Sequence, residues 1–169
     1  MKTVYLAGGC FWGAEKYLSL LSGVLSTTVG YANGHTQNPV YEEVCAGNTG
    51  HAETVRVLFD ETVLPLTSLL NLFFEMIDPV SVNRQGEDTG DQYRTGIYYA
   101  DEADRPTVQD ALCRLQAETT GRVAVECQPL HFFCEAEEYH QQYLLKHPDG
   151  YCHVPADRFD RARQYTEGR

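Results

Sequence analysis

The stretch TVYLAGGCFWGAEKYLSLLSG, residues 3–23, contains the junction from which the rest of the fold is predicted. Its apolar start at 3–7 is typical of a short strand, and a pair of glycines ends that strand. A helix is expected from Gly13 to about Leu21, because apolar residues recur at helical spacing before the next glycine. Cys10 therefore lies between the end of a strand and the beginning of a helix.

Beyond this junction, apolar strand and helix patterns alternate with long polar connections. Further strands are expected at 24–31, 53–60, 93–100 and 122–127. Further helices are expected at 65–77, 104–120 and 136–147. Two polar, glycine-bearing segments, 32–50 and 81–92, are expected to be long functional loops. Few strands and long loops favour an α+β two-layer sandwich over a large doubly wound sheet.

The length and charge of the chain narrow the range of possible functions. The 169 residues fit a single domain, 1–169, with a charged surface tail over about 153–169. A net charge of −11 repels phosphate backbones and anionic lipid, which argues against nucleic acid and membrane surfaces as partners. There is no secretory signal and no apolar run of about 18 residues, so we expect a cytoplasmic protein.

Six cysteines occur in the chain, at positions 10, 45, 113, 127, 134 and 152. Without a secretory signal, free thiols are a better interpretation than three disulfides. No pair has the CxxC spacing, so neither a zinc knuckle nor a thioredoxin-type redox pair is predicted.

Cys10 has surroundings that favour a reactive thiol. A helix N-terminus presents unpaired N–H groups and partial positive charge, which we expect to favour a thiolate. The flanking glycines allow a tight turn, and Phe11 and Trp12 would form an apolar wall beside the sulfur. The alternative is an inert, buried cysteine packed among core aromatic residues.

Glu53 is the first candidate acid. It shares the strand parity of Val55, Val57 and Phe59, so it should project onto the buried face of its strand. Burial raises the pKa of a carboxyl group, and a neutral acid facing a pocket is suited to general acid catalysis. The alternative is a glutamate at the strand's first residue that escapes into solvent.

Other polar segments are ambiguous taken singly. The acidic loop 85–94 lacks the alternating ligands and closing glutamate of a calcium-binding EF-hand. Tyr139, His140, Tyr143 and His147 would form a stripe on the last predicted helix, and such a stripe is most often ordinary packing.

Five blocks taken together are much more specific than any one of them. They are GCFWG (9–13), YEEVCAGNTGHAE (41–53), NRQGEDTGDQYR (83–94), AEEYHQQYL (136–144) and GYCH (150–153). In this order they resemble the A-type peptide methionine sulfoxide reductases, over residues 4 to about 154. The resemblance implies an α+β sandwich with a ferredoxin-like core. It also implies reduction of methionine S-sulfoxide, free or in proteins, as a repair of oxidative damage.

The resemblance also assigns roles to residues. Cys10 would be the nucleophile that attacks the sulfoxide sulfur, and Glu53 would protonate the sulfoxide oxygen. The substrate-binding residues would be Phe11 and Trp12 for the methyl group, Tyr41 and Tyr93 for the oxygen, and Asp88 through an ordered water.

The resemblance implies that Cys152 resolves the Cys10 sulfenic acid as a disulfide, which thioredoxin, or dithiothreitol in vitro, then reduces. No metal or organic cofactor is expected, and we expect a monomer. Some family members have a further cysteine in a glycine-rich tail, whereas none follows Cys152 in this chain. The remaining cysteines are interpreted as structural, with a possible backup resolving role for Cys134: Cys45, Cys113, Cys127 and Cys134.

Two rival hypotheses remain open at this point. In a thiol hydrolase or acyltransferase, His51 or His140 would serve Cys10 as base and Glu53 would orient it. In a metal-binding module, the ligands would be His131, Cys134, Cys152 and His153, although their spacing matches no standard zinc pattern.

Overall fold

The computed structural model describes residues 1–47 and 49–165. Its main sheet has six strands in the order β7-β6-β1-β3-β2-β8, and β4 and β5 form a separate hairpin. The strands are β1 (Lys2–Gly8), β2 (Val24–Ala32), β3 (Ala52–Phe59), β4 (Arg84–Gln85), β5 (Asp88–Thr89), β6 (Thr95–Tyr99), β7 (Glu126–Pro129) and β8 (Phe133–Glu135). The helices are α1 (Phe11–Ser19), α2 (Tyr41–Cys45), α3 (Leu66–Glu75), α4 (Arg105–Glu118), α5 (Tyr143–Lys146) and α6 (Ala156–Gln164). Short 3-10 turns occur at η1 (Asp91–Tyr93), η2 (Glu102–Asp104) and η3 (Glu138–His140).

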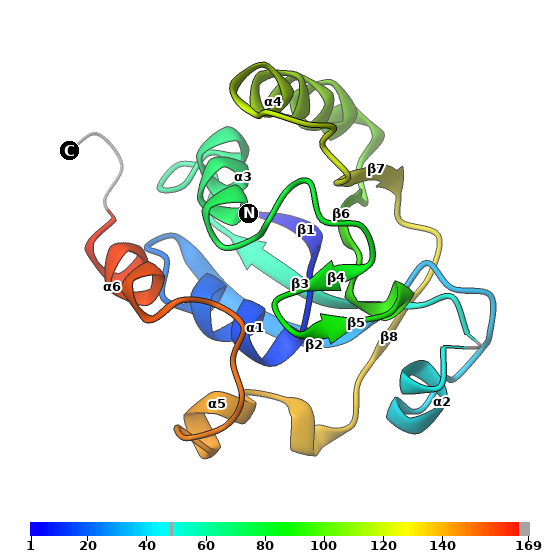
Figure 1. The fold of residues 1–169 in the computed structure, drawn as a ribbon. Coiled ribbons are helices and arrows are strands. Elements are labelled where there is room, and N and C mark those ends of the chain that lie inside the picture. Colours follow the sequence, from blue (N-terminus) through cyan, green and yellow to red (C-terminus); the bar gives the residue numbers. More distant parts are fainter. Residues whose placement is uncertain (48, 166–169) are drawn as a thin grey trace.

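The centre of the sheet confirms the predicted α+β sandwich with a ferredoxin-like core. Strand β1 pairs antiparallel with both β3 and β6, and β2 pairs antiparallel with β3. Helix α1 connects β1 to β2, and α3 lies between β3 and β6 in the chain (Figure 1). Two strand–helix–strand units are therefore interleaved. Because β1 is a central strand, the beginning of α1 lies at the end of a central strand of the sheet.

The alternation of side chains along β1 divides the core in two. Val4 and Leu6 belong to the main hydrophobic cluster, together with the buried faces of α1 and α3. Ala7, on the opposite face, belongs to a smaller cluster beneath residues 130–133. The Tyr17 hydroxyl donates a 2.7 Å hydrogen bond to the Leu72 carbonyl, which joins α1 to α3. Burial on both faces fixes the strand register, because a one-residue slip would exchange the two sets.

The prediction of a single helix over 136–147 is wrong. Only the η3 turn and the four-residue α5 form there, separated by Gln142 at φ 52. Two tertiary contacts replace the helical hydrogen bonds at this break. The Gln142 N–H donates to the buried Glu15 carboxylate at 2.6 Å, and the Gln141 side chain pairs with both backbone groups of Val29. The segment is thus held to α1 and β2, and these contacts outweigh helix propensity.

The expected surface tail over 153–169 is mostly exposed in its described part, which ends at residue 165, but that part is helical and has one buried face. Helix α6 forms there and runs beside α1 (Figure 1). Phe159 and Ala162 are buried in the main cluster, and the Lys16 ammonium lies 4.4 Å from the centre of the Phe159 ring. The apolar face of α6 is narrow, because its two buried residues are three positions apart among charged residues. This pattern was too short to predict a buried helix.

The remaining differences are local. The predicted loop 32–50 contains α2, and the predicted loop 81–92 contains the β4–β5 hairpin. The strand predicted at 122–127 begins later, as β7, and β8 was not predicted. Cys113 is exposed on α4 and Cys45 is exposed on α2, so neither is a core residue. Within the described residues, no helix is long and apolar enough to span a membrane.

Replacing Phe159 with alanine tests the docking of α6. We expect the free energy of unfolding to fall by about 3 kcal/mol, because a large buried ring is lost and a cavity remains. Urea denaturation followed by circular dichroism measures this change. Gln164→Ala, at an exposed position of the same helix, is the matched control and should leave the midpoint unchanged. Equal midpoints for both variants would contradict the docking of α6.

Candidate active site

Cys10 lies at the N-cap of α1, directly after Gly9, whose φ of 83 allows the sharp turn out of β1. Its side chain is 7% exposed. Burial raises the pKa of the Cys10 thiol well above its usual value, and the charge of Glu53 adds to this effect. The N–H groups of Trp12 and Gly13 act in the opposite direction without overcoming burial. The expectation of a resting thiolate is therefore wrong, because desolvation outweighs the helix terminus.

Glu53 lies next to Cys10 and projects inward from β3, as its strand parity predicted. It is 1% exposed, and its Oε1 accepts a 3.2 Å hydrogen bond from the Phe11 N–H. Burial raises the pKa of Glu53 to about 8, against the opposing Phe11 bond, and Asp88 raises it further. Because Oε1 already accepts a bond, the proton belongs on Oε2, which is buried and has no partner among the described residues. The site thus holds a neutral acid with a free O–H donor.

The predicted oxygen-binding residues surround this acid. Burial raises the pKa of both Tyr41 and Tyr93, and the charge of Glu53 contributes to each shift. Burial likewise raises the pKa of Asp88, although the Tyr151 hydroxyl partly offsets the shift by donating to it. Both phenols are therefore protonated donors near neutral pH. Asp88 Oδ2 is buried and has no hydrogen-bond partner within residues 1–47 and 49–165.

Phe11 and Trp12 follow Cys10 directly, as the first residues of α1. The Trp12 ring stacks on Tyr143 at 3.8 Å, and its Nε1–H donates to His140 Nδ1 at 3.0 Å. The fully buried His140 ring also packs 5.2 Å from Phe11 and 4.4 Å from Tyr41. One imidazole thus touches Phe11, Trp12 and Tyr41, three of the predicted substrate-binding residues.

Several of these supporting residues were not identified as such from the sequence. His140 and Tyr143 were interpreted as a packing stripe on a helix that does not form. Glu137, in the same block, accepts hydrogen bonds from the Tyr31 hydroxyl at 2.9 Å and the Tyr41 N–H at 3.1 Å. The one sequence signal for them was the run of polar and aromatic residues in AEEYHQQYL, residues 136–144.

Cys152 lies against the first turn of α1. A Cβ placed on Gly13 would be 2.7 Å from its Sγ, so the sulfur occupies the space that the missing side chain leaves. The Cys152 thiol donates a long 3.7 Å bond to the Val154 carbonyl, and burial raises its pKa. Glycine at position 13 therefore allows the second thiol to approach the helix turn that begins with Cys10.

The geometry does not support the rival hypotheses. His51 Nδ1 accepts from the Gly34 N–H at 2.9 Å, and its Nε2 lies 2.8 Å from the Thr36 carbonyl, so both nitrogens are occupied in holding the 32–50 loop. His140 serves Trp12 instead of Cys10. Throughout residues 1–47 and 49–165, no three His, Cys, Asp or Glu side chains are placed to hold a metal ion, and the proposed ligand set does not gather.

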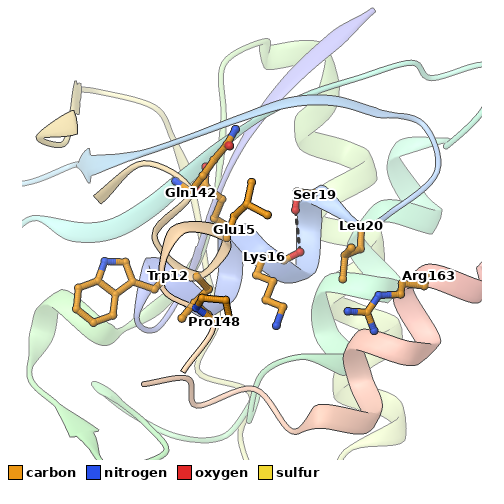
Figure 2. A pocket seen from close by; sticks show the side chains of 10 residues that line it. Trp12, Glu15, Lys16, Ser19, Leu20, Gln142, Pro148 and Arg163 are labelled. Atoms are coloured by element: carbon orange, nitrogen blue, oxygen red, sulfur yellow. Dashed lines mark hydrogen bonds between the residues drawn. The ribbon is translucent and has the colours of Figure 1, made fainter. Parts of the chain in front are cut away.

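An apolar groove of about 440 Å³ begins on the outer side of Trp12 and does not include Cys10 or Glu53. Figure 2 shows Trp12 at one end of this groove and Arg163 at the other, with Leu20 between them. Trp12 therefore belongs both to the groove and to the candidate active site, although the groove contains neither Cys10 nor Glu53.

The fold and the site define a thiol enzyme in which a buried cysteine at a strand–helix junction faces a buried, protonated carboxylic acid. Comparison with known proteins identifies the kind of thiol enzyme. A family model described as "Peptide methionine sulfoxide reductase" matches residues 2–168. The "Peptide methionine sulfoxide reductase MsrA" of Lachnoclostridium phytofermentans is 58% identical over 162 residues, which cover 96% of this chain and 98% of that protein.

Solved structures agree with this match. Mxr1 from Saccharomyces cerevisiae in reduced form has a TM-score of 0.85 and 38% identity, covering 89% of this chain and 88% of that chain. Mxr1 in complex with Trx2 has a TM-score of 0.61 and 26% identity, covering 84% of each chain. The chain belongs to the peptide methionine sulfoxide reductase family, A type. It is an oxidoreductase that reduces methionine sulfoxide and serves the repair of oxidised proteins.

Proposed function

We propose that this chain reduces the S epimer of methionine sulfoxide, free or in proteins, through a Cys10 sulfenic acid that Cys152 resolves. The observation that carries the proposal is the neighbouring pair of Cys10 and Glu53, in which the protonated Glu53 Oε2 is buried and has no partner in the described part of the chain. A sulfoxide oxygen is a good acceptor but a poor leaving group until it is protonated. The free Oε2–H supplies the proton, and the phenols of Tyr41 and Tyr93 supply further donors where charge develops.

The first half of the reaction is a two-electron transfer. The Cys10 sulfur attacks the sulfoxide sulfur while Glu53 protonates the oxygen. The oxygen then passes to Cys10, the sulfur–oxygen bond of the substrate breaks, and methionine leaves. Glu53 regains the proton that the Cys10 thiol gave up, so a thiol and a sulfoxide become a sulfenic acid and a thioether.

Selectivity follows from the two sides of the site. Phe11 and Trp12 present apolar surface for the substrate methyl group, and Glu53 and the phenols present donors for the oxygen. Asp88, whose Oδ2 has no partner among the residues that the structure describes, would act through an ordered water. With methyl group and oxygen both fixed, only one sulfoxide configuration directs its sulfur at Cys10, in keeping with one enzyme for each epimer.

The second half of the reaction regenerates the thiols. The Cys152 sulfur displaces hydroxide from the Cys10 sulfenic acid, and the resulting disulfide is reduced by thioredoxin through thiol–disulfide exchange. The structure of yeast Mxr1 with Trx2 supports a thioredoxin as reductant. We propose that a single chain completes this cycle in the cytoplasm, without metal or organic cofactor, and that dithiothreitol replaces thioredoxin in vitro.

Cys152→Ser is expected to stop the cycle after one turnover. Without reductant the variant should release one methionine per chain and accumulate sulfenic acid on Cys10, because the oxygen-transfer step does not need Cys152. With thioredoxin it should lose turnover, whereas dithiothreitol, which attacks the sulfenic acid directly, should restore part of it. Methionine release and mass spectrometry of a trapped sulfenic acid measure both steps. Cys113→Ser, at an exposed cysteine of α4, is the matched control. Thioredoxin-driven turnover of Cys152→Ser at the wild-type rate would refute the resolving role.

A further inference from the structure

His153, the residue after Cys152, has a feature that the proposed cycle does not use. Its ring packs against the turn that precedes Cys10, with Nε2 2.8 Å from the Gly8 carbonyl oxygen. A Cβ placed on Gly9 would lie 3.1 Å from Nε2, and one placed on Gly86 would lie 3.1 Å from the His153 Cβ. Two glycines therefore leave room for this side chain, between the Cys10 turn and the β4–β5 hairpin.

The contact with Gly8 determines the tautomer of His153. A carbonyl oxygen only accepts hydrogen bonds, so Nε2 carries the proton and donates it. Nδ1 then has a free lone pair. This atom is buried and has no hydrogen-bond partner among the described residues. Burying an unpaired acceptor is unfavourable, so such an atom requires an explanation.

The Cys152 sulfur lies on the same side of α1 as this lone pair. The position of a Cβ on Gly13 would be 2.7 Å from Cys152 Sγ and 3.5 Å from His153 Nδ1, so both atoms face the same part of α1. Among the residues that the structure describes, the thiol proton is held by the long 3.7 Å bond to the Val154 carbonyl. A rotation about the Cys152 side chain would turn the thiol proton away from Val154, and Nδ1 is an acceptor that faces the same part of α1.

Cys152 needs a base for its part in the cycle. The thiolate is the species that attacks a sulfenic sulfur, yet burial raises the pKa of this thiol. Burial also lowers the pKa of His153, so the ring is neutral and able to accept a proton near neutral pH. The charge of Lys16 on α1 acts on the Cys152 thiol and lowers its pKa against the effect of burial. Burial raises the pKa of the neighbouring Tyr151 hydroxyl, and the charges of Asp88 on β5 and Cys10 raise it further.

We propose that His153 Nδ1 accepts the Cys152 thiol proton as the Cys152 sulfur attacks the Cys10 sulfenic acid. This inference rests on the proposed cycle. The S–S bond forms, the S–O bond of Cys10 breaks, and the imidazolium returns the proton to the departing hydroxide as water. The Nε2–H bond to Gly8 holds the ring in place and strengthens while the ring is charged. A thiol and a sulfenic acid thus give a disulfide and water, with no net change of protons.

His153→Gln tests this role. A glutamine amide can keep the donor to the Gly8 carbonyl, but it has no basic nitrogen. Single-turnover quench experiments with S-sulfoxide should show methionine release at the wild-type rate. Disulfide formation, measured as loss of free thiols, should slow by about 100-fold, at the lower end of general-base effects. The rate should recover as pH rises, because the thiolate then forms without a base. His131→Gln, at an exposed histidine, is the control and should match wild type.

Two outcomes would overturn the inference. One is disulfide formation in His153→Gln as fast as in wild type across the pH range. The other is an equal slowing of methionine release and disulfide formation, which would assign the ring a packing role only. A failure of the proposed cycle itself is distinguishable, since wild type would then release methionine without forming a Cys10–Cys152 disulfide.

Discussion

Cys10→Ser is expected to release no methionine from methionine sulfoxide, in single-turnover or steady-state conditions. Sulfur can take over the oxygen of a sulfoxide because a sulfenic acid is an accessible oxidation state. A serine hydroxyl would have to form an oxygen–oxygen bond to take over that oxygen, so replacing the one sulfur atom with oxygen should abolish the reaction entirely. Chromatographic measurement of methionine tests this result, with Cys113→Ser as the control. A burst of methionine from Cys10→Ser would remove Cys10 from the nucleophile's role.

Glu53→Gln is expected to slow sulfenic acid formation by about 10²–10⁴-fold, the usual contribution of a positioned general acid. The glutamine amide fills the same space and can accept from the Phe11 N–H, but it cannot transfer a proton. Rapid-quench measurement of methionine release gives this rate. An unchanged rate at neutral pH would show that the proton comes from another group.

The pH dependence of the same step gives an independent test of Glu53. The wild-type rate should be high below the pKa of about 8 and fall as pH rises through it, because the proton donor is lost. Glu53→Gln should lack this fall. The folded chain keeps the Glu53 proton at pH values where the unfolded chain has released it, so wild type loses stability as pH rises toward 8. The variant should therefore be no less stable at neutral pH, which separates lost chemistry from lost folding.

Much of the site was predictable because it lies on regular elements. The period-two pattern of β3 placed Glu53 on the buried face, and the glycine pair after β1 placed Cys10 at the beginning of α1. Both predictions follow from local backbone geometry alone, which a single sequence expresses well.

The rest depends on contacts between distant parts of the chain. Glu15 on α1 binds the N–H of Gln142 and ends a helix that the local pattern favours. The protonation of Cys10 depends on how deeply the folded chain buries it, which the residues beside it in the sequence do not reveal. The contacts of His140 with Trp12 and Tyr41 likewise form only on folding, because His140 is 128 positions from Trp12 in the sequence and 99 from Tyr41.

A single-turnover assay of freshly reduced wild type with separated S and R epimers of methionine sulfoxide, without added reductant, tests the proposed cycle as a whole. We expect about one methionine per chain from the S epimer, none from the R epimer, and a disulfide between Cys10 and Cys152 afterwards. Equal reduction of both epimers, or reduction of neither, would contradict the proposed cycle.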